Sequence, residues 1–251
     1  MLAYALRTVK LLLVSSGITN ASIRNALIDL LGKPIEESSA LFIATGMHPF
    51  AGGPGGIHRA IAGDAKGKLY DLGWKSIGLL ELTALPSIDR ATWEPGVREA
   101  EAILVWGGDP VYLAHWLRKS GVADLFAEME NAVYVGVSAG AIATARIFCE
   151  TYSNPPKRDG EVLKSEKIWW LGANGEEEVD LVTAPGIGLV HFAVIPHYVN
   201  PDHGEVTPTN AERWAAHIPS ASYAIDEATA LKVVDTEVEV VSEGVWRLFN
   251  N

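Results

Sequence analysis

The sequence predicts a doubly wound α/β fold, in which helices cover both faces of a mostly parallel sheet. Short apolar runs recur along the chain and end in glycine or small residues, as buried strands do. The segments between these runs carry apolar residues at helical spacing. Runs that are apolar throughout indicate strands covered on both sides, and the alternation of strand and helix is typical of parallel sheets.

The elements follow in a regular order from the N-terminus. Five runs are predicted as strands, at residues 9–14, 40–44, 77–82, 102–106 and 133–137, with helices expected at 20–31 and 110–129. Further along, residues 188–195 are predicted as a strand, 210–217 as a helix and 230–241 as a terminal hairpin. This order favours a flavodoxin-like sheet.

One segment departs from the pattern. Residues 151–180 are charged, contain proline and glycine, and include Trp169 and Trp170. We expect this segment to be an excursion that acts as a flap, and we expect residues 1–251 to form one domain, since a chain of this length buries a full core.

Composition narrows the classes of partner. The formal net charge is −11 and no basic stripe is present, so we expect neither nucleic acid nor a membrane as a partner. No stretch approaches the roughly 18 apolar residues of a membrane span. The single cysteine, Cys149, is expected as a buried residue in the helix after Ser138, and fits a cytoplasmic protein. The oligomeric state stays open, a homodimer included.

The strongest motif is a G-x-S-x-G pattern at residues 136–140, directly after an apolar run and before a helix-compatible run. A nucleophile elbow has this context: a tight strand-to-helix turn exposes the serine hydroxyl, and the flanking glycines permit close backbone approach. We therefore predict Ser138 as a nucleophile, against the alternative of a tight structural turn.

A second glycine-rich turn, Gly107-Gly108-Asp109, ends the preceding predicted strand. Parallel strands present their C-terminal loops along one edge of the sheet, so this turn is expected beside Ser138. The backbone N–H groups of Gly108 and Ala139 are predicted to form an oxyanion hole. The alternative is a turn without a chemical role.

The serine requires a general base, and the chain has seven histidines. His197 follows a predicted strand through Pro196, which places it at the active edge of the sheet. His191 and His203 stand six residues to either side of it, but no close ligand pair accompanies them, so no metal is expected. We predict His197 as the base and His203 as part of a solvated loop beside the site.

An acidic residue is expected to orient the histidine. Glu227 and Asp226 follow a short apolar stretch, whereas Glu177 and Asp180 lie in the excursion. Glu227 is our choice, and the other three carboxylates remain alternatives.

These motifs resemble the peptidase E family of aspartyl dipeptidases, with cyanophycinase as a related branch. The resemblance spans nearly the whole chain and rests on the order of the strand at 10–16, the G-G-D turn, the elbow, the segment 196–198 and the segment 225–227 before an Ala-Leu-x-Val strand. It implies a fold similar to class I glutamine amidotransferases. It also implies that Ser138, His197 and Glu227 form a triad and that Gly108 contributes to the oxyanion hole. We assign Gly107, Asp109 and Tyr198, which stand in the matching motifs, to substrate binding.

The resemblance stops short of aspartate selectivity. Family members that select an N-terminal aspartate carry arginine in a G-E-T-R segment, and residues 204–208 of this chain read G-E-V-T-P. We therefore expect a cofactor-independent serine peptidase that cleaves dipeptides or short peptides through an acyl-enzyme. The alternatives are a carboxylic esterase, although no HGGG-type loop precedes Ser138, and a non-catalytic binding protein.

Overall fold

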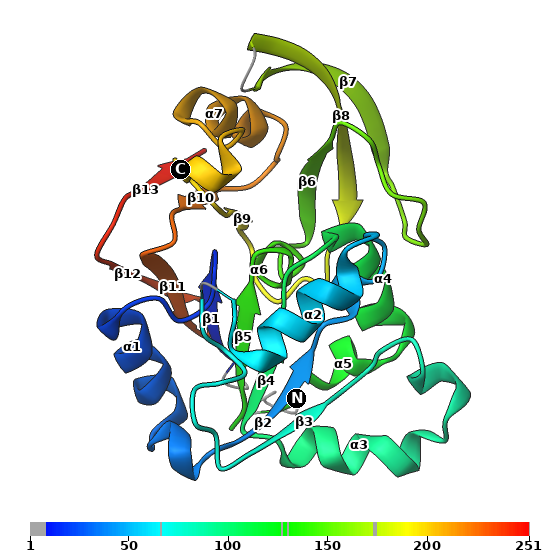
Figure 1. Ribbon diagram of the computed structural model, residues 1–251, viewed down its shortest axis with the longest axis vertical. Helices are drawn as coiled ribbons and strands as arrows, with labels where there is room; N and C mark the ends of the chain where they lie inside the picture. Colours follow the sequence, from blue (N-terminus) through cyan, green and yellow to red (C-terminus); the bar gives the residue numbers. More distant parts are fainter. Residues whose placement is uncertain (1–8, 66, 127, 130, 173–174, 251) are drawn as a thin grey trace, which may run out of the picture.

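The computed structural model describes residues 9–250, apart from 66, 127, 130, 173 and 174. Within this part of the chain, seven strands form the central sheet in the order β12-β11-β1-β5-β4-β2-β3 (Figure 1). Their bounds are β1 (Lys10–Val14), β2 (Ser39–Ile43), β3 (Ser76–Leu79), β4 (Ala102–Val105), β5 (Val133–Val137), β11 (Thr229–Val234) and β12 (Glu237–Ser242). The first five are parallel to one another, while β11 and β12 are antiparallel. The predicted doubly wound, mostly parallel α/β fold is confirmed.

Helices cover both faces of this sheet. One face packs against α1 (Ala21–Leu31) and α2 (Gly53–Ala62), the other against α3 (Arg90–Glu99), α4 (Pro110–Lys119) and α5 (Val122–Phe126). Strand β1 shows why its run is apolar throughout: Leu12 and Val14 belong to the first core, and Leu11 and Leu13 to the second. Alternate side chains of a strand point to opposite faces, so a sheet between two helical layers needs apolar residues at every position.

The helix ends follow from local chemistry. Asn20 caps α1, because its side chain accepts the N–H of Ile23, and Gly32 ends this helix in a left-handed conformation. The single helix predicted over 110–129 is two helices, because Gly121 takes a positive φ of 80° between α4 and α5. Four 3₁₀ helices lie elsewhere in the described chain, at Ile35–Glu37, Thr45–Met47, Leu85–Ser87 and Pro201–His203.

Two smaller sheets lie beyond the central one. Strands β6 (Ile147–Tyr152), β8 (Gly175–Pro185) and β7 (Lys164–Gly172) form an antiparallel sheet that rises above the central sheet next to α7 (Pro208–Ala216), as Figure 1 shows. We call it the excursion sheet. The other small sheet contains β9 (Ala193–Ile195), β10 (Ser222–Ile225) and β13 (Trp246–Phe249). No helix within the described residues has the length and apolar character to cross a bilayer.

Two expectations about these elements were wrong. The helix after Ser138, α6 (Ala139–Ile142), is short, and Cys149 lies on strand β6 rather than in it. The run I-F-C-E-T-Y is rich in aromatic and β-branched residues and pairs with β8. Cys149 is nevertheless buried. The strand expected over 188–195 is limited to its last three residues, β9.

Candidate active site

Ser138 occupies a strained turn between β5 and α6. Its φ of 50° and ψ of −111° lie outside the regions that most side chains favour. A Cβ on Gly140 would stand 2.2 Å from the carbonyl oxygen of Val105, and one on Gly136 would stand 2.6 Å from that of Gly140. Only glycine fits at either position, which is the physical reason for the G-x-S-x-G pattern.

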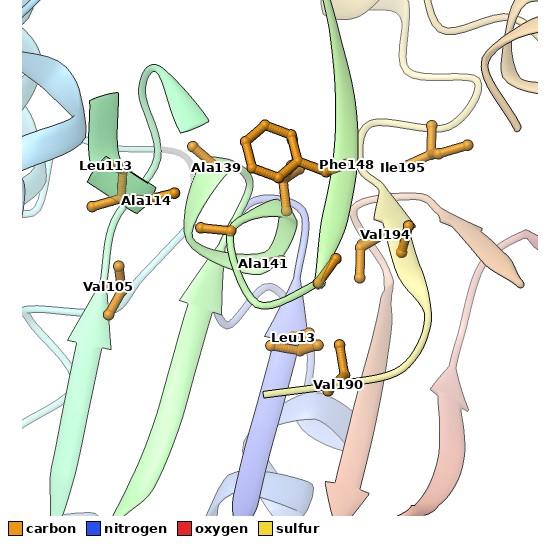
Figure 2. Close-up of a cluster of buried hydrophobic side chains, with 14 of the residues drawn as sticks. Leu13, Val105, Leu113, Ala114, Ala139, Ala141, Phe148, Val190, Val194 and Ile195 are labelled. Atoms are coloured by element: carbon orange, nitrogen blue, oxygen red, sulfur yellow. The ribbon is translucent and has the colours of Figure 1, made fainter. Parts of the chain in front are cut away.

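Helix α6 is seated on the sheet by small side chains. Ala139 and Ala141 are fully buried in a hydrophobic cluster that also contains Val105 and Phe148 (Figure 2). The hydroxyl of Tyr134 donates a hydrogen bond of 2.7 Å to the carbonyl oxygen of Gly140. The position of the elbow is thus set by packing on both sides of α6, and Ser138 faces the C-terminal edge of the sheet.

His197 reaches Ser138 from the loop after β9. Its Nε2 lies 3.0 Å from Ser138 Oγ, and its Nδ1 lies 2.8 Å from Oε1 of Glu227. An ionised carboxylate only accepts hydrogen bonds, so Nδ1 carries the proton in the neutral ring and Nε2 is free to accept one from the serine. His197 has a φ of 63°, and its N–H donates to Ser15 Oγ, which in turn donates to the carbonyl of Ile225. These two bonds fix the strained histidine backbone to its neighbours.

Glu227 is held at the start of the turn between β10 and β11. Its Oε1 also accepts hydrogen bonds from Asn200 Nδ2 and from Ser16 Oγ, and its carbonyl oxygen accepts one from Thr19. Burial opposes ionisation, but the hydrogen bonds from His197 and Asn200 lower the pKa of Glu227 below its ordinary value. Glu227 is therefore ionised at neutral pH and suited to stabilise a charged imidazole.

The rival carboxylates are engaged elsewhere. Asp226 accepts hydrogen bonds from the backbone of Ala228 and Val245, and so organises its own turn. Asp180 pairs with Lys167, and Glu177 lies on β8 without a hydrogen bond to His197. Of the four carboxylates considered, the structure brings only Glu227 to the histidine within the residues it describes.

The glycine turn passes directly beside the elbow. A Cβ on Gly107 would lie 3.3 Å from that of Ser138, and Gly108, with a φ of 124°, leaves a Cβ no room against the backbone of Gly46. Gly108 and Ser138 line the same cavity. The N–H of Ala139 is the first of helix α6, where helical N–H groups lack an intrahelical acceptor. Both predicted oxyanion donors therefore lie next to Ser138.

Two residues predicted to bind substrate have other surroundings. Asp109 is fully buried: its Oδ1 accepts the N–H of Tyr112 and the Nε–H of Arg158, and its Oδ2 accepts the hydroxyl of Tyr152. Tyr198 is 8% exposed, its side chain belongs to the hydrophobic core, and it does not line the cavity. Tyr198 thus lies outside the cavity, whereas Asp109 lines it with a carboxylate that is engaged by Tyr112, Tyr152 and Arg158. Substrate binding by either residue stays a prediction.

A cavity of about 390 Å³ extends from Ser138 toward the excursion sheet. Its lining residues are Phe50, Gly108, Asp109, Pro110, Ser138, Ile142, Glu150, Thr151, Tyr152, Ser153, Trp170, Glu177, Val179, Pro196, His197, His203, Glu205, Val206 and Trp214. Within the described ranges, no group of three or more histidine, cysteine or acidic residues is arranged to hold a metal ion. The cavity thus extends from Ser138 and His197 to Trp170, Glu177 and Val179 in the segment that the sequence predicts as a flap.

Sequence reasoning missed the role of His203. Its ring stacks on that of His197, with the centroids 3.9 Å apart and the planes 13° from parallel. The hydrogen bond from His203 to Glu205 raises the pKa of this histidine, although burial opposes the shift. His197 lies in the loop after β9 and His203 in the 3₁₀ helix Pro201–His203, so no strand or helix periodicity indicated the stack.

Fold and site together define an α/β protein with a Ser-His-Glu constellation at the carboxyl edge of its parallel strands. Comparison with known proteins identifies the family. The chain belongs to peptidase family S51, whose family model matches residues 11–241. The resemblance to peptidase E predicted from the motifs is confirmed at the level of the family.

Individual relatives are distant. Peptidase E of Nostoc sp. (strain PCC 7120) is 25% identical over 163 residues, which span 61% of this chain and 57% of the relative. A protein provisionally assigned as peptidase E from Listeria monocytogenes EGD-e has a crystal structure with a TM-score of 0.61 and 17% identity, covering 94% of this chain and 100% of its own. A peptidase from an acI-B1 Actinobacterium gives a TM-score of 0.57 and 19% identity, with coverage of 98% and 93%. At these identities the two structures show a common fold.

Proposed function

We propose that the chain is a serine peptidase that hydrolyses dipeptides or short peptides, with Ser138 as nucleophile. The observation that carries this proposal is the continuous hydrogen-bond chain from Ser138 Oγ through His197 to Glu227. Membership in peptidase family S51 supports the reaction class. A cavity of about 390 Å³ lies near the lower end of the range of small-molecule sites, about 300–1,000 Å³, which favours a short substrate.

In the first half of the reaction, His197 Nε2 accepts the proton of Ser138 Oγ while the oxygen attacks the amide carbonyl carbon. The N–H groups of Gly108 and Ala139 donate hydrogen bonds to the resulting oxyanion. His197 then returns the proton to the amine nitrogen, the C–N bond breaks, and an acyl-enzyme forms on Ser138. Glu227 stabilises the imidazolium throughout.

In the second half, water replaces the amine. His197 removes a proton from this water, the hydroxide attacks the acyl carbon, and the proton passes to Ser138 Oγ as the ester bond breaks. The products are the free carboxylic acid and the original enzyme. Each step uses groups of the chain itself.

The order of the triad favours the peptidase over the esterase alternative. In α/β-hydrolases the acid precedes the histidine along the chain, whereas Glu227 follows His197. This observation, together with the family, makes an amide the preferred substrate.

Hydrolysis of a dipeptide panel tests the proposal. The panel holds Asp-X, Glu-X, Lys-X and neutral-X members, with simple esters alongside, and the enzymes are the wild type, Ser138→Ala and the control Ser165→Ala, an exposed serine on β7. We expect peptide cleavage by the wild type and the control and none by Ser138→Ala. Cleavage of esters alone would favour the esterase, and absence of any Ser138-dependent turnover would favour a binding protein.

A further inference from the structure

The cavity beside Ser138 is acidic. Asp109, Glu150, Glu177 and Glu205 line it, and no lysine or arginine does so in the part of the chain that the structure describes. Of its lining residues, only the histidines His197 and His203 can carry a positive charge. Its wall therefore differs in charge from one built to receive an aspartate side chain.

Two of these carboxylates interact with a basic side chain. Asp109 forms an ion pair of 2.7 Å with Arg158, whose side chain is 9% exposed, and Glu205 accepts a hydrogen bond from His203 at 3.3 Å. Glu150 differs from both. Among described residues its one hydrogen-bond donor is the backbone N–H of Thr151, 2.8 Å from Oε1, so its second oxygen has no protein partner.

Aromatic side chains line the same cavity as this carboxylate. Trp170 and Trp214 line the same cavity, pack edge to face with their ring centroids 5.8 Å apart, and are almost fully buried. Trp214 donates its indole N–H to the carbonyl of Cys149, the residue before Glu150. A carboxylate beside aromatic rings attracts an ammonium or guanidinium and accommodates the apolar stem that carries it.

We propose that Glu150 is a specificity-determining residue that binds a cationic group of the peptide substrate, an ammonium or a guanidinium. The proposal rests on the peptidase function proposed above and names its substrate class. We assign the cation to the residue on the acyl side of the scissile bond, and Glu150 lines the same cavity as Ser138 and Gly108. Two sources share this chemistry: the side chain of lysine or arginine, and the free amino terminus.

The ionisation of Glu150 provides an additional signature. Burial raises its pKa to about 8, and the nearby charges of Asp109 and Glu205 act in the same direction. The backbone N–H of Thr151 and the charge of Arg158 act in the opposite direction, and the thiol of Cys149 and the hydroxyl of Tyr152 are the other titratable groups nearby. A bound cation favours the ionised carboxylate and releases a proton. For a lysine or arginine side chain, which stays protonated over this range, the preference for the cationic over the neutral substrate should therefore increase as the pH rises from 6 toward 9.

The first test compares Lys-X with norleucine-X, which keeps the apolar stem and lacks the ammonium. If the side-chain ammonium is bound, we expect the wild type to favour Lys-X in kcat/KM by about 10- to 100-fold, the range of a hydrogen bond to a charged group. Glu150→Gln should remove this preference while still cleaving norleucine-X. The matched control Glu176→Gln, a β8 carboxylate outside the cavity that pairs with Arg213, should retain it.

Acetylation distinguishes the two sources of the cation. If the side chain is bound, acetylation of its ε-amine abolishes the effect of Glu150→Gln; if the amino terminus is bound, Nα-acetylation abolishes it and Glu150→Gln weakens all unblocked dipeptides alike. Either result supports the proposal. Equal kcat/KM values for wild type and Glu150→Gln on every member of the series would overturn it.

Binding to an inactive variant separates this inference from the peptidase function. Calorimetry with Ser138→Ala measures the affinity for Lys-X and norleucine-X, with and without Glu150→Gln. A Lys-X preference that depends on Glu150, without turnover by the wild type, would refute the peptidase and retain the cation site. Ser138-dependent turnover with no influence of Glu150 on binding would retain the peptidase and refute the cation site.

Discussion

Replacing Glu150 by glutamine should stabilise the protein at neutral pH, and the gain should shrink as the pH falls. The substitution keeps the shape of the side chain and removes its charge. Burial raises the pKa of Glu150 from 4.5 to about 8, so the folded state holds this proton more tightly than the unfolded state does. The contribution of this proton to the free energy of unfolding is fully present below pH 4.5 and is lost as the pH rises through 8. Glutamine is neutral throughout and does not suffer this loss.

The magnitude follows from the two pKa values. Linkage gives a loss for the wild type of about 3 kcal/mol at pH 7 and about 1 kcal/mol at pH 5. The difference of roughly 2 kcal/mol is an upper limit, because Glu150 is only partly buried and lines the cavity, where solvent screens its charge. We therefore expect Glu150→Gln to gain about 1–2 kcal/mol relative to wild type between pH 5 and pH 7. Other titrating groups are common to both proteins and cancel in the comparison.

Urea unfolding of the two proteins at pH 5, 6 and 7 measures this difference directly. The free energy of unfolding of Glu150→Gln minus that of the wild type should increase with pH, at an unchanged m-value. Glu176→Gln provides the control, since its exposed carboxylate should give a small difference at every pH. A difference between Glu150→Gln and wild type that is independent of pH, or that decreases with pH, would refute a partly buried carboxylate whose ionisation is disfavoured at this position.

Three further predictions concern the elbow, the triad and the glycine turn. Glu227→Gln should lower kcat by about 10³- to 10⁴-fold because the imidazolium loses its ionised partner, while KM for a dipeptide changes little; an unchanged kcat would remove Glu227 from the triad. Gly140→Ala should cost about 1–3 kcal/mol of unfolding free energy by overpacking, seen as a lower Tm, whereas Gly96→Ala, in helix α3 with open space around it, should raise Tm. Arg158→Leu should cost about 3–5 kcal/mol because Asp109 stays buried without its cation, and adding Asp109→Asn should recover part of this; additive losses in urea unfolding would argue against the pair.

Patterns in the sequence predicted the central sheet because its strands are buried on both faces. Apolar runs such as residues 102–105 contain no polar position, and this signal survives without knowledge of any partner strand. The excursion sheet gave no such signal. Strand β8 begins with the acidic run 176–178, all exposed, and its identity as a strand depends on pairing with β7 across a hairpin.

The candidate site likewise contains some residues that local sequence patterns predict and others that they do not. The serine elbow is a local pattern, since the glycines flanking Ser138 are required by contacts within a few residues and with one neighbouring strand. His197 was predicted from its place after a strand, and the structure brings His197 and Ser138 within hydrogen-bond distance. The stack of His203 and the exposure of Glu150 to the cavity depend on how separate loops and sheets meet, which no spacing along the chain encodes.

The ion pair between Arg158 and Asp109 connects two parts of the protein with different tasks. Arg158 belongs to the loop between β6 and β7, whose sheet supplies Glu150 and Trp170 to the cavity wall, while Asp109 ends the turn that carries Gly108. A graft that transplanted the excursion of another protein onto this scaffold would remove the counterion of a fully buried aspartate. Successful chimaeras should therefore keep arginine at this position or neutralise Asp109. The excursion sheet and the glycine turn cannot be exchanged independently of each other.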